Sequence, residues 1–183
     1  MAKVPYRSRE DAAGADQELY DRLEAERPVP TAHIFLALAH APEQLNAFLD
    51  YANSLRSCEL DRRMRELLVL TIGHAVGSSY EVAHHEPYAL AAGLSPEQIS
   101  AVPVAEESGL FDENDMALIR LGRAFCAGEL SQPDWDRLAA GLSTRQMVQL
   151  ALTAAWYLSG AQLMRILDLD LEAHYLKPPV PEA

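Results

Sequence analysis

Residues 62–94 combine titratable and apolar side chains more closely than any other part of the chain. Glu66 precedes a nearly continuous apolar run, and Glu81, His84 and His85 follow that run after a glycine–serine break. Glu81 and His85 are four residues apart, so a helix would place them on one face. A carboxylate beside an imidazole can orient the ring and raise its basicity, as is usual for a histidine general acid or base. We therefore predict that His85, together with Glu66 and Glu81, carries proton-transfer chemistry.

Two helices joined by a tight break must position these side chains. Residues 67–76 are apolar on nearly every side of a helix, which is typical of a core or an oligomer interface. Gly77 supplies a helix stop, and Ser78 can begin the next helix, with Glu81 at the spacing of a capping box. Glu66 lies 12 residues before Ser78, about 18 Å along a helix. It meets the groups of the second helix only if that helix folds back over the first, or if another element completes the site.

Further polar and aromatic side chains are candidates for binding a substrate. His84 points about 100° away from His85 on a helix and is either a surface residue or a second member of the site. Ser78 is more simply a helix cap, because no Gly-x-Ser-x-Gly elbow surrounds it. The histidines in apolar stretches are expected to be packed, and of these we place His33 nearest a pocket. The predicted substrate-binding residues are His84, Tyr80, Tyr88, Ser78, His33 and Tyr157.

Several short strings in this region resemble the carboxymuconolactone decarboxylase family, which shares the alkylhydroperoxidase D-like fold. They are R-x-R-E-L at residues 63–67, Y-E-x-x-H-H at 80–85 and A-x-x-A-G-L-S at 89–95. The alkylhydroperoxidase D branch carries a glutamate, then Cys-x-x-Cys, then a histidine four residues on. Those places fall at Glu66, Ser78, Glu81 and His85, so both cysteines are absent here. The decarboxylase-like branch also lacks the cysteine pair, and the resemblance extends from about residue 31 to residue 171.

This resemblance implies an all-α helical bundle that needs no cofactor and assembles as a homo-oligomer, a trimer or a hexamer. It also implies a lyase acting on a small organic acid or lactone, by decarboxylation or a related isomerase step. His85 would move a proton at a carbon next to a carbonyl group. Glu66 and Glu81 would orient the ring or serve as a second acid or base, and Tyr80 or Tyr88 could contribute to an anion hole.

Three alternatives remain open. A thiol peroxidase needs a thiol of low pKa with a resolving partner, whereas Cys58 and Cys126 form no Cys-x-x-Cys pair. A ferritin-like metal centre needs Glu-x-x-His on two helices plus two more glutamates, whereas Glu81-x-x-His84 stands alone, so we predict no metal. The third alternative is a helical binding protein without catalytic activity.

Composition limits the class of protein and its partners. A chain of 183 residues with 49% hydrophobic residues can form one domain, with a loose arm at 1–15 and an extended tail at 177–183. The net charge of −12 opposes binding to nucleic acid or anionic lipid. No run of about 20 apolar residues could span a bilayer, so we expect no membrane partner. The absence of an apolar leader segment and the two isolated cysteines lead us to expect a cytoplasmic protein.

Helical periodicity extends along the rest of the chain, without the alternation typical of strands. We expect a connector at 102–110 and helices at 16–27, 33–41 (capped by Thr31), 42–56, from Ser95, at 112–126, from Ser131, and at 143–159 paired with 160–169. A shift of 83 residues lays residues 144–161 over 61–78 as a weak internal repeat, with LALTAAWYLSG matching LLVLTIGHAVG. The second copy lacks the ionisable groups, and we interpret it as scaffold.

Overall fold

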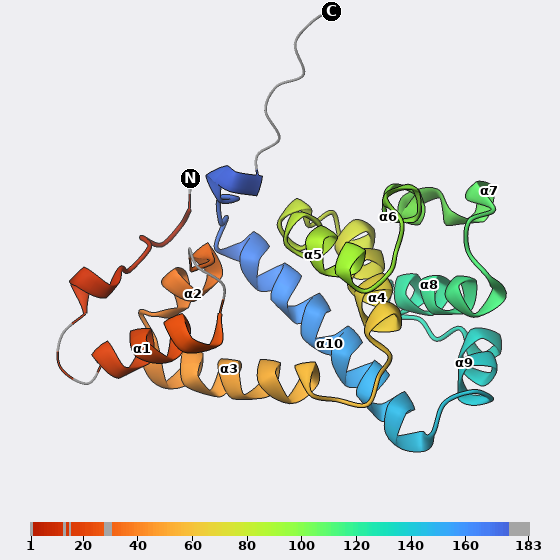
Figure 1. The fold of residues 1–183 in the computed structure, drawn as a ribbon, viewed down its shortest axis with the longest axis horizontal. Helices are drawn as coiled ribbons and strands as arrows, with labels where there is room; N and C mark the ends of the chain where they lie inside the picture. Colours follow the sequence, from red (N-terminus) through yellow and green to blue (C-terminus); the bar gives the residue numbers. More distant parts are fainter. Residues whose placement is uncertain (1, 13, 15, 28–30, 176–183) are drawn as a thin grey trace, which may run out of the picture. The chain divides into compact units, whose positions relative to one another are not determined.

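The computed structural model describes residues 2–12, 14, 16–27 and 31–175 (Figure 1). The described residues form α-helices and short 3-10 turns without a strand, which confirms the predicted all-α class. The chain divides into two compact units: a terminal unit of residues 1–56 with 164–183, and a central unit of residues 57–163. Each unit has its own cluster of buried apolar side chains.

The terminal unit is built on amphipathic helices from the first third of the chain. Its elements are the 3-10 turn η1 (Arg9–Asp11), α1 (Asp16–Glu26), α2 (His33–Leu38), α3 (Pro42–Arg56) and the 3-10 turn η3 (Ala173–Tyr175). The core of this unit contains Leu19, Tyr20, Leu23, Leu45 and Leu49. The predicted Thr31 cap is wrong: Ala32 has extended backbone and is the N-cap of α2, so Thr31 lies one residue too early.

The N-terminal segment is hydrogen-bonded to the rest of this unit. The Tyr20 hydroxyl donates to the Arg7 carbonyl at 2.7 Å, and the Arg7 guanidinium lies 2.7 Å from Asp16. The Lys3 amide donates to the carbonyl of Leu167 at 2.8 Å, which joins the two ends of the chain. The tail predicted at 177–183 lies outside the described residues.

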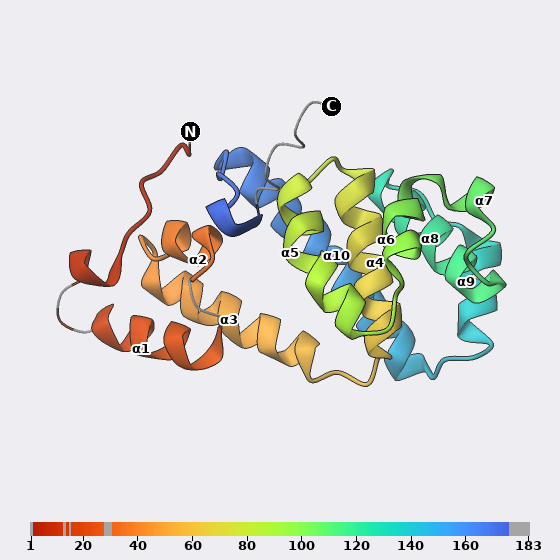
Figure 2. The same ribbon diagram turned by 45° about the horizontal axis from the view of Figure 1, so that its top comes forward.

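The central unit is organised around α4, which packs against α5 and α8. Its elements are α4 (Arg62–Ala75), α5 (Ser79–Ala91), α6 (Pro96–Ala101), η2 (Val102–Val104), α7 (Ala105–Ser108), α8 (Glu113–Cys126), α9 (Gln132–Ala139) and most of α10 (Thr144–Ile166). Leu67, Leu70 and Ile72 of α4 are completely buried. A helix covered on both sides needs apolar residues all round, which explains the continuous run that the sequence shows. Figure 2 shows α4 and α5 lying side by side.

Two glycines let α4 approach its neighbours closely. A Cβ atom at Gly73 would lie 3.0 Å from the Val82 side chain of α5. A Cβ atom at Gly122 of α8 would lie 3.1 Å from the side chains of Leu68 and Thr71 of α4. Both distances are tighter than ordinary side-chain contacts, so these glycines set the helix spacing on either side of α4.

The turn between α4 and α5 forms where the sequence predicts it. Asp61 caps α4 by accepting from the Met64 amide at 3.0 Å. Gly77 has a φ of 69°, a left-handed conformation that favours glycine, and ends the helix. The Ser78 hydroxyl then accepts from the Glu81 amide at 3.3 Å, which begins α5. The chain therefore reverses within a few residues.

Two other predicted helix starts are also confirmed, whereas the connector is partly helical. Ser95 and Gln98 form a capping box with Pro96 at the first helical position. Ser143 and Gln146 bond reciprocally at 2.9 and 3.2 Å, at the start of α10. The predicted connector at 102–110 instead forms η2 and α7, which end at Gly109 with a φ of 64°.

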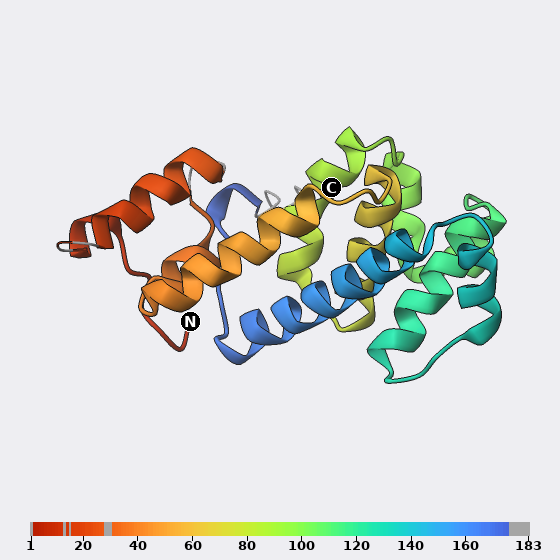
Figure 3. The ribbon, with the colours of Figure 1, turned by 90° about the horizontal axis from the view of Figure 1, so that it is seen from below.

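The last helix differs from the prediction of a pair at 143–159 and 160–169. Helix α10 runs without interruption from Thr144 to Ile166, as Figure 3 shows. Gly160 lies in its interior and, unlike Gly77, is not among the glycines with positive φ. An interior glycine costs a helix only about 1 kcal/mol, so the packing of α10 outweighs it. The internal repeat is therefore not continued as a second hairpin.

Candidate active site

Three helices of the central unit supply the candidate site. Helix α4 provides Glu66 in its second turn, and α5 provides Glu81 and His85. Helix α10 provides Tyr157 and Gly160. The reversal at Gly77 folds α5 back along α4. Glu66 therefore lies beside His85, although it is about 18 Å along the helix from Ser78.

Glu66 and His85 form the shortest contact of the site. The Nδ1 atom of His85 lies 2.7 Å from Oε2 of Glu66, within hydrogen-bonding distance. The Glu66 side chain is 4% exposed and that of His85 is 15% exposed. This bond fixes the plane of the imidazole and directs its other nitrogen, Nε2, away from Glu66.

Glu81 lies beside that second nitrogen. Its Oε2 is 3.6 Å from His85 Nε2, one helical turn away on α5. Because the Ser78 hydroxyl bonds the Glu81 amide, the start of α5 is fixed while the Glu81 carboxyl group extends toward His85. The imidazole therefore has a carboxyl group at each of its nitrogens.

The environments of the two carboxyl groups shift their pKa values in opposite directions. Burial raises the pKa of Glu66, but the hydrogen bond and charge of His85, together with Arg65, outweigh burial and lower it overall. The Arg65 Nε atom lies 3.2 Å from Glu66 Oε1. Burial raises the pKa of Glu81, and the neighbouring histidines do not offset that effect. Glu66 is therefore the ionised partner of His85, and Glu81 is held toward the neutral form.

Two tyrosines contact the ring of His85. The Tyr157 ring meets it edge-on, at 5.0 Å between centroids and 89° between planes. The Tyr88 ring lies 5.7 Å away at 52°. The structure thus brings together five of the residues that the sequence singled out, namely Glu66, Glu81, His85, Tyr88 and Tyr157.

The other four predicted residues have different surroundings. Tyr80 and His84 stack on each other, with centroids 4.3 Å apart. Ser78 caps α5. His33 lies in the terminal unit, where its amide donates to Glu172 at 2.6 Å and its Nδ1 lies 2.7 Å from the Asp170 carbonyl. These contacts give His33 and Ser78 structural roles within their own units.

Sequence reasoning did not single out Arg65 and Gly160. Arg65 precedes Glu66 directly, and adjacent helical residues do not normally face each other, so the pattern gave no reason to pair them. Gly160 was interpreted as a break. The sequence does contain a signal that Gly160 lies inside a continuous helix: Ala161 and Gln162, which follow it, cannot cap a new helix.

Neither a metal centre nor a reactive thiol is evident among the described residues. They contain no group of three or more His, Cys, Asp or Glu side chains placed to hold a metal ion. Cys58 and Cys126 are both unbridged and half-buried. Burial raises the pKa of the Cys126 thiol, the opposite of what a reactive thiolate needs. None of the described helices is long and apolar enough to cross a membrane.

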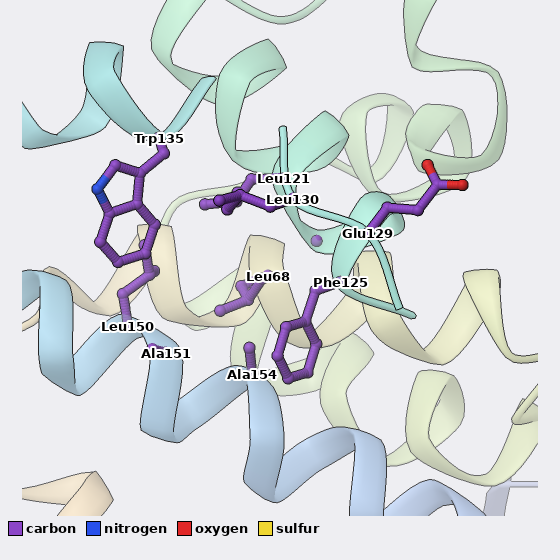
Figure 4. A pocket seen from close by; sticks show the side chains of 10 residues that line it. Leu68, Leu121, Phe125, Glu129, Leu130, Trp135, Leu150, Ala151 and Ala154 are labelled. Atoms are coloured by element: carbon purple, nitrogen blue, oxygen red, sulfur yellow. The ribbon is translucent and has the colours of Figure 1, made fainter. Parts of the chain in front are cut away.

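A separate apolar pocket lies between α4, α8 and α10 (Figure 4). It has a volume of about 60 Å³, and its lining includes Leu68, Phe125, Trp135 and Leu150. The Glu129 carboxylate points away from the other labelled side chains. Leu68 is two residues from Glu66, about 200° around the helix, so this pocket opens on a different side of α4 from His85.

The fold is shared with helical proteins of known structure. A peroxidase-related protein from Ralstonia eutropha JMP134, with an alkylhydroperoxidase AhpD core, superposes with a TM-score of 0.80 at 18% identity, over 95% of this chain and 94% of that one. The debrominase Bmp8, a Cys-to-Ala variant in complex with 2,3,4-tribromopyrrole, gives a TM-score of 0.79 at 16% identity, over 96% and 94%. A peroxidase-related protein from Silicibacter sp. TM1040 gives 0.74 at 18% identity, over 96% and 97%. These likenesses define the fold as alkylhydroperoxidase D-like.

Residues 42–128 match the model of the Carboxymuconolactone decarboxylase family. This match agrees with the resemblance predicted from residues 63–95 and covers just under half of the chain. A sequence search of curated proteins gave no match. The matched range includes α3, the α4–α5 hairpin and α8, and therefore Glu66, Glu81 and His85.

Proposed function

We propose that this protein is an acid/base enzyme acting on a small organic acid or lactone, by decarboxylation or a related lyase or isomerase step. The observation that carries the proposal is the half-buried imidazole of His85, with Glu66 at 2.7 Å from Nδ1 and Glu81 at 3.6 Å from Nε2. Two carboxyl groups with opposite pKa shifts around one imidazole are suited to separate acid and base roles. The match of residues 42–128 to the Carboxymuconolactone decarboxylase family supports the same class of chemistry.

The side chains can perform a decarboxylation without a redox step. When the carboxylate leaves as CO2, the electron pair of the broken C–C bond moves into an adjacent carbonyl group to give an enolate. The imidazolium form of His85 donates its Nε2 proton to the carbon, which forms the new C–H bond. Glu66 stabilises the imidazolium through Nδ1, and a proton from solvent restores the ring. The net reaction consumes one proton and releases one CO2.

An isomerisation uses the same groups in a different order. Neutral His85 takes a proton from a carbon next to a carbonyl, and the enolate that forms is reprotonated at another atom. Glu81, held toward the neutral form, is placed to donate to the carbonyl oxygen as negative charge develops there. Both reactions depend on His85, so both are tested by the same variant.

The test is a screen of carboxylactones, lactones and β-keto acids for CO2 release or ring opening. For the substrate found, His85→Ala should lower kcat by about 10²–10⁴-fold, the usual contribution of a positioned proton-transfer group. The matched control is His40→Ala, a histidine of the terminal unit whose ring contacts the Pro5 carbonyl. Nearly full activity in His85→Ala would refute the role of His85, whereas absence of turnover with every compound of the screen would favour a helical binding protein without catalysis.

Peroxidase activity is a second candidate because two of the similar structures are peroxidase-related proteins. Ser78 and Glu81 stand where the alkylhydroperoxidase D branch has cysteines, and burial raises the pKa of the Cys126 thiol. We therefore expect no turnover of alkyl hydroperoxide with a dithiol. Turnover that is lost in Cys58→Ser or Cys126→Ser would instead support a thiol peroxidase.

The expected trimeric or hexameric assembly and cytoplasmic location remain predictions. Light scattering on the purified protein measures the first, and cell fractionation the second.

A further inference from the structure

Two arginines in the first turn of α4 have different partners. The two terminal nitrogens of the Arg63 guanidinium contact the Asp115 carboxylate of α8, at 2.6 and 2.7 Å. The Nε atom of Arg65 instead donates to Oε1 of Glu66, the next residue of the same helix, at 3.2 Å. The Arg63 contact therefore ties α4 to α8. The Arg65 contact joins two neighbours in the chain and acts on the orientation and the charge of the Glu66 carboxylate.

The Glu66 carboxylate is held at both of its oxygens. Oε2 lies 2.7 Å from Nδ1 of His85, and Oε1 accepts the hydrogen bond from Arg65. Adjacent residues of a helix project about 100° apart, so the Arg65 side chain has to bend over Glu66 to make this contact. Both side chains are shielded from water, with exposed fractions of 13% for Arg65 and 4% for Glu66. The carboxylate cannot turn away from the imidazole without breaking one of these two bonds.

The proton of the Glu66–His85 hydrogen bond has two possible positions. When it is on Nδ1, Glu66 is a carboxylate. When it is on Glu66, the carboxyl group is neutral and Nδ1 is unprotonated. Burial favours the neutral carboxyl group, because a charged group loses its hydration there. A fixed positive charge beside Oε1 favours the carboxylate, and a guanidinium keeps its proton at every pH at which proteins are folded.

The contacts of Arg65 place its charge on the Glu66 side of this hydrogen bond. Its charge and its hydrogen bond follow those of His85 among the causes that lower the pKa of Glu66 against the effect of burial. Because Nε is bonded to Glu66, the charge of Arg65 stabilises the negative member of the pair more than it repels the positive one.

The other titratable groups around the imidazole do not replace this charge. Glu81, which lies near Nε2, is held toward the neutral form by burial, and the charge of His84 acts on Glu81. The remaining neighbours of the ring are the side chains of Tyr88 and Tyr157. The position of the shared proton therefore depends on Arg65.

We propose that Arg65 is a positioning residue that, through Glu66, keeps the proton of the Glu66–His85 hydrogen bond on Nδ1 of the imidazole. The inference rests on the proposed function, in which His85 gives its Nε2 proton to a substrate carbon. A ring with both nitrogens protonated is a cation and donates that proton readily. If the shared proton moved to Glu66, the ring would be neutral and would hold its Nε2 proton far more tightly.

The test is NMR on the wild-type protein and on two variants that separate the charge of Arg65 from its hydrogen bond. Histidine is labelled with ¹⁵N and glutamate with ¹³C at Cδ, and the signals of His85 and Glu66 are assigned by their loss in His85→Ala and Glu66→Gln. Arg65→Gln removes the charge but retains a donor, because the glutamine amide nitrogen is as many bonds from Cα as Nε of arginine. Arg65→Lys retains the charge and has a methylene group in that place.

In the wild-type protein and in Arg65→Lys, Nδ1 should give the ¹⁵N shift of a protonated nitrogen and Glu66 the ¹³C shift of a carboxylate. In Arg65→Gln, at a pH where both ring nitrogens are protonated in the wild-type protein, the two signals should move toward those of an unprotonated nitrogen and a neutral carboxyl group. With a substrate from the screen, kcat should fall about tenfold in Arg65→Gln, which corresponds to one pKa unit. It should stay near the wild-type value in Arg65→Lys.

Arg63→Gln is the matched control, because it is the same substitution two residues earlier on α4. It leaves the buried Asp115 without its bidentate partner, so it should lower the melting temperature without moving the signals of His85 and Glu66.

Four results would overturn the inference. They are unchanged signals in Arg65→Gln, an equal change in Arg63→Gln, a change in Arg65→Lys as large as in Arg65→Gln, and a wild-type Glu66 signal of a neutral carboxyl group. The last of these does not require Arg65→Gln to fold.

The outcomes also separate this inference from the proposed function. If the signals do not move in Arg65→Gln but His85→Ala is inactive, Arg65 lacks this role and the proposed function stands. If the signals move as expected but His85→Ala keeps full activity, the proposed function fails, and the effect of Arg65 on the proton remains as a property of the pair.

Discussion

The α4–α5 hairpin and α10 begin from similar sequences and end as different structures. LLVLTIGHAVG and LALTAAWYLSG share their apolar pattern and their final glycine. The chain reverses at Gly77, whose φ is 69°, but continues as a helix through Gly160. Ser78 caps a new helix after the first glycine, whereas Ala161 and Gln162 follow the second. A glycine after an apolar run therefore ends a helix when the next residues can begin another.

The two glycines contribute to the site in different ways. The reversal at Gly77 brings Glu66 within 2.7 Å of His85, a contact that the straight path of α4 would not allow. The helical Gly160 lets the backbone of α10 lie close to Glu81, because even a Cβ atom there would be 3.4 Å from Oε1. One glycine thus places the charged partner of the imidazole, and the other lets α10 pack against the opposite, buried carboxyl group.

The largest expected effect is a loss of kcat that occurs when Glu66 is changed but not when Gln149, its equivalent in the second copy of the repeat, is changed. Glu66→Gln leaves Nδ1 of His85 without its anionic partner and should lower kcat by about 10²–10⁴-fold. The shift of 83 residues places Gln149 opposite Glu66, and Gln149→Ala should leave kcat unchanged because this residue bonds the Glu59 amide instead. Steady-state kinetics on a substrate from the screen measures both. An equal loss in the two variants would show that α10 takes part in the chemistry as α4 does.

The next effect concerns the pH dependence of stability. The pKa of Glu81 is raised in the folded protein, so the folded state binds more protons and stability falls as pH rises from the ordinary carboxyl pKa through the raised one. Glu81→Gln should remove this fall and increase the free energy of unfolding by roughly 1–3 kcal/mol above that range. The pKa of Glu66 is lowered in the folded protein. Its contribution to the free energy of unfolding is therefore fully present above the ordinary carboxyl pKa, and it is lost as pH falls through the lowered pKa of the folded state. Urea denaturation across pH measures both slopes, and a wild-type slope in Glu81→Gln would contradict the assignment.

The smallest effect compares the two glycines themselves. Gly77→Ala forces alanine into a left-handed conformation and should destabilise the protein by about 1–2 kcal/mol. Gly160→Ala should be neutral or stabilising by up to about 1 kcal/mol, because alanine is the better helix former. Thermal and chemical denaturation measure both variants. A larger loss for Gly160→Ala would mean that its side chain meets atoms closer than Glu81 Oε1.

Local chemistry made much of this fold predictable from the sequence. The Ser95 and Ser143 capping boxes, the start of α3 at Pro42 and the reversal at Gly77 each depend on a few adjacent residues. The continuity of α10 was missed because Gly160 alone was interpreted as a helix stop, although Ala161 and Gln162 after it offer no cap for a new helix. Likewise, no strong cap or periodicity in the sequence predicts the 3-10 helix η2 and the short helix α7 at 102–108.

The candidate site was predictable to the extent that helix geometry decides it. Glu81 and His85 share a face because they are four residues apart. The contact of Glu66 with His85 depended on how α5 folds back, which spacing alone left open. The edge-on contact of Tyr157 and the approach of Gly160 join segments more than 70 residues apart, and only the packing of α10 fixes them.

The bond between Glu66 and Nδ1 holds the imidazole in one orientation, because rotation of the ring would break a part-buried contact of 2.7 Å. Proton transfer through Nε2 is consequently directional in space. A planar enolate held beside Glu81 would receive its proton on one face, so that a product with a new stereocentre at that carbon would form as a single enantiomer.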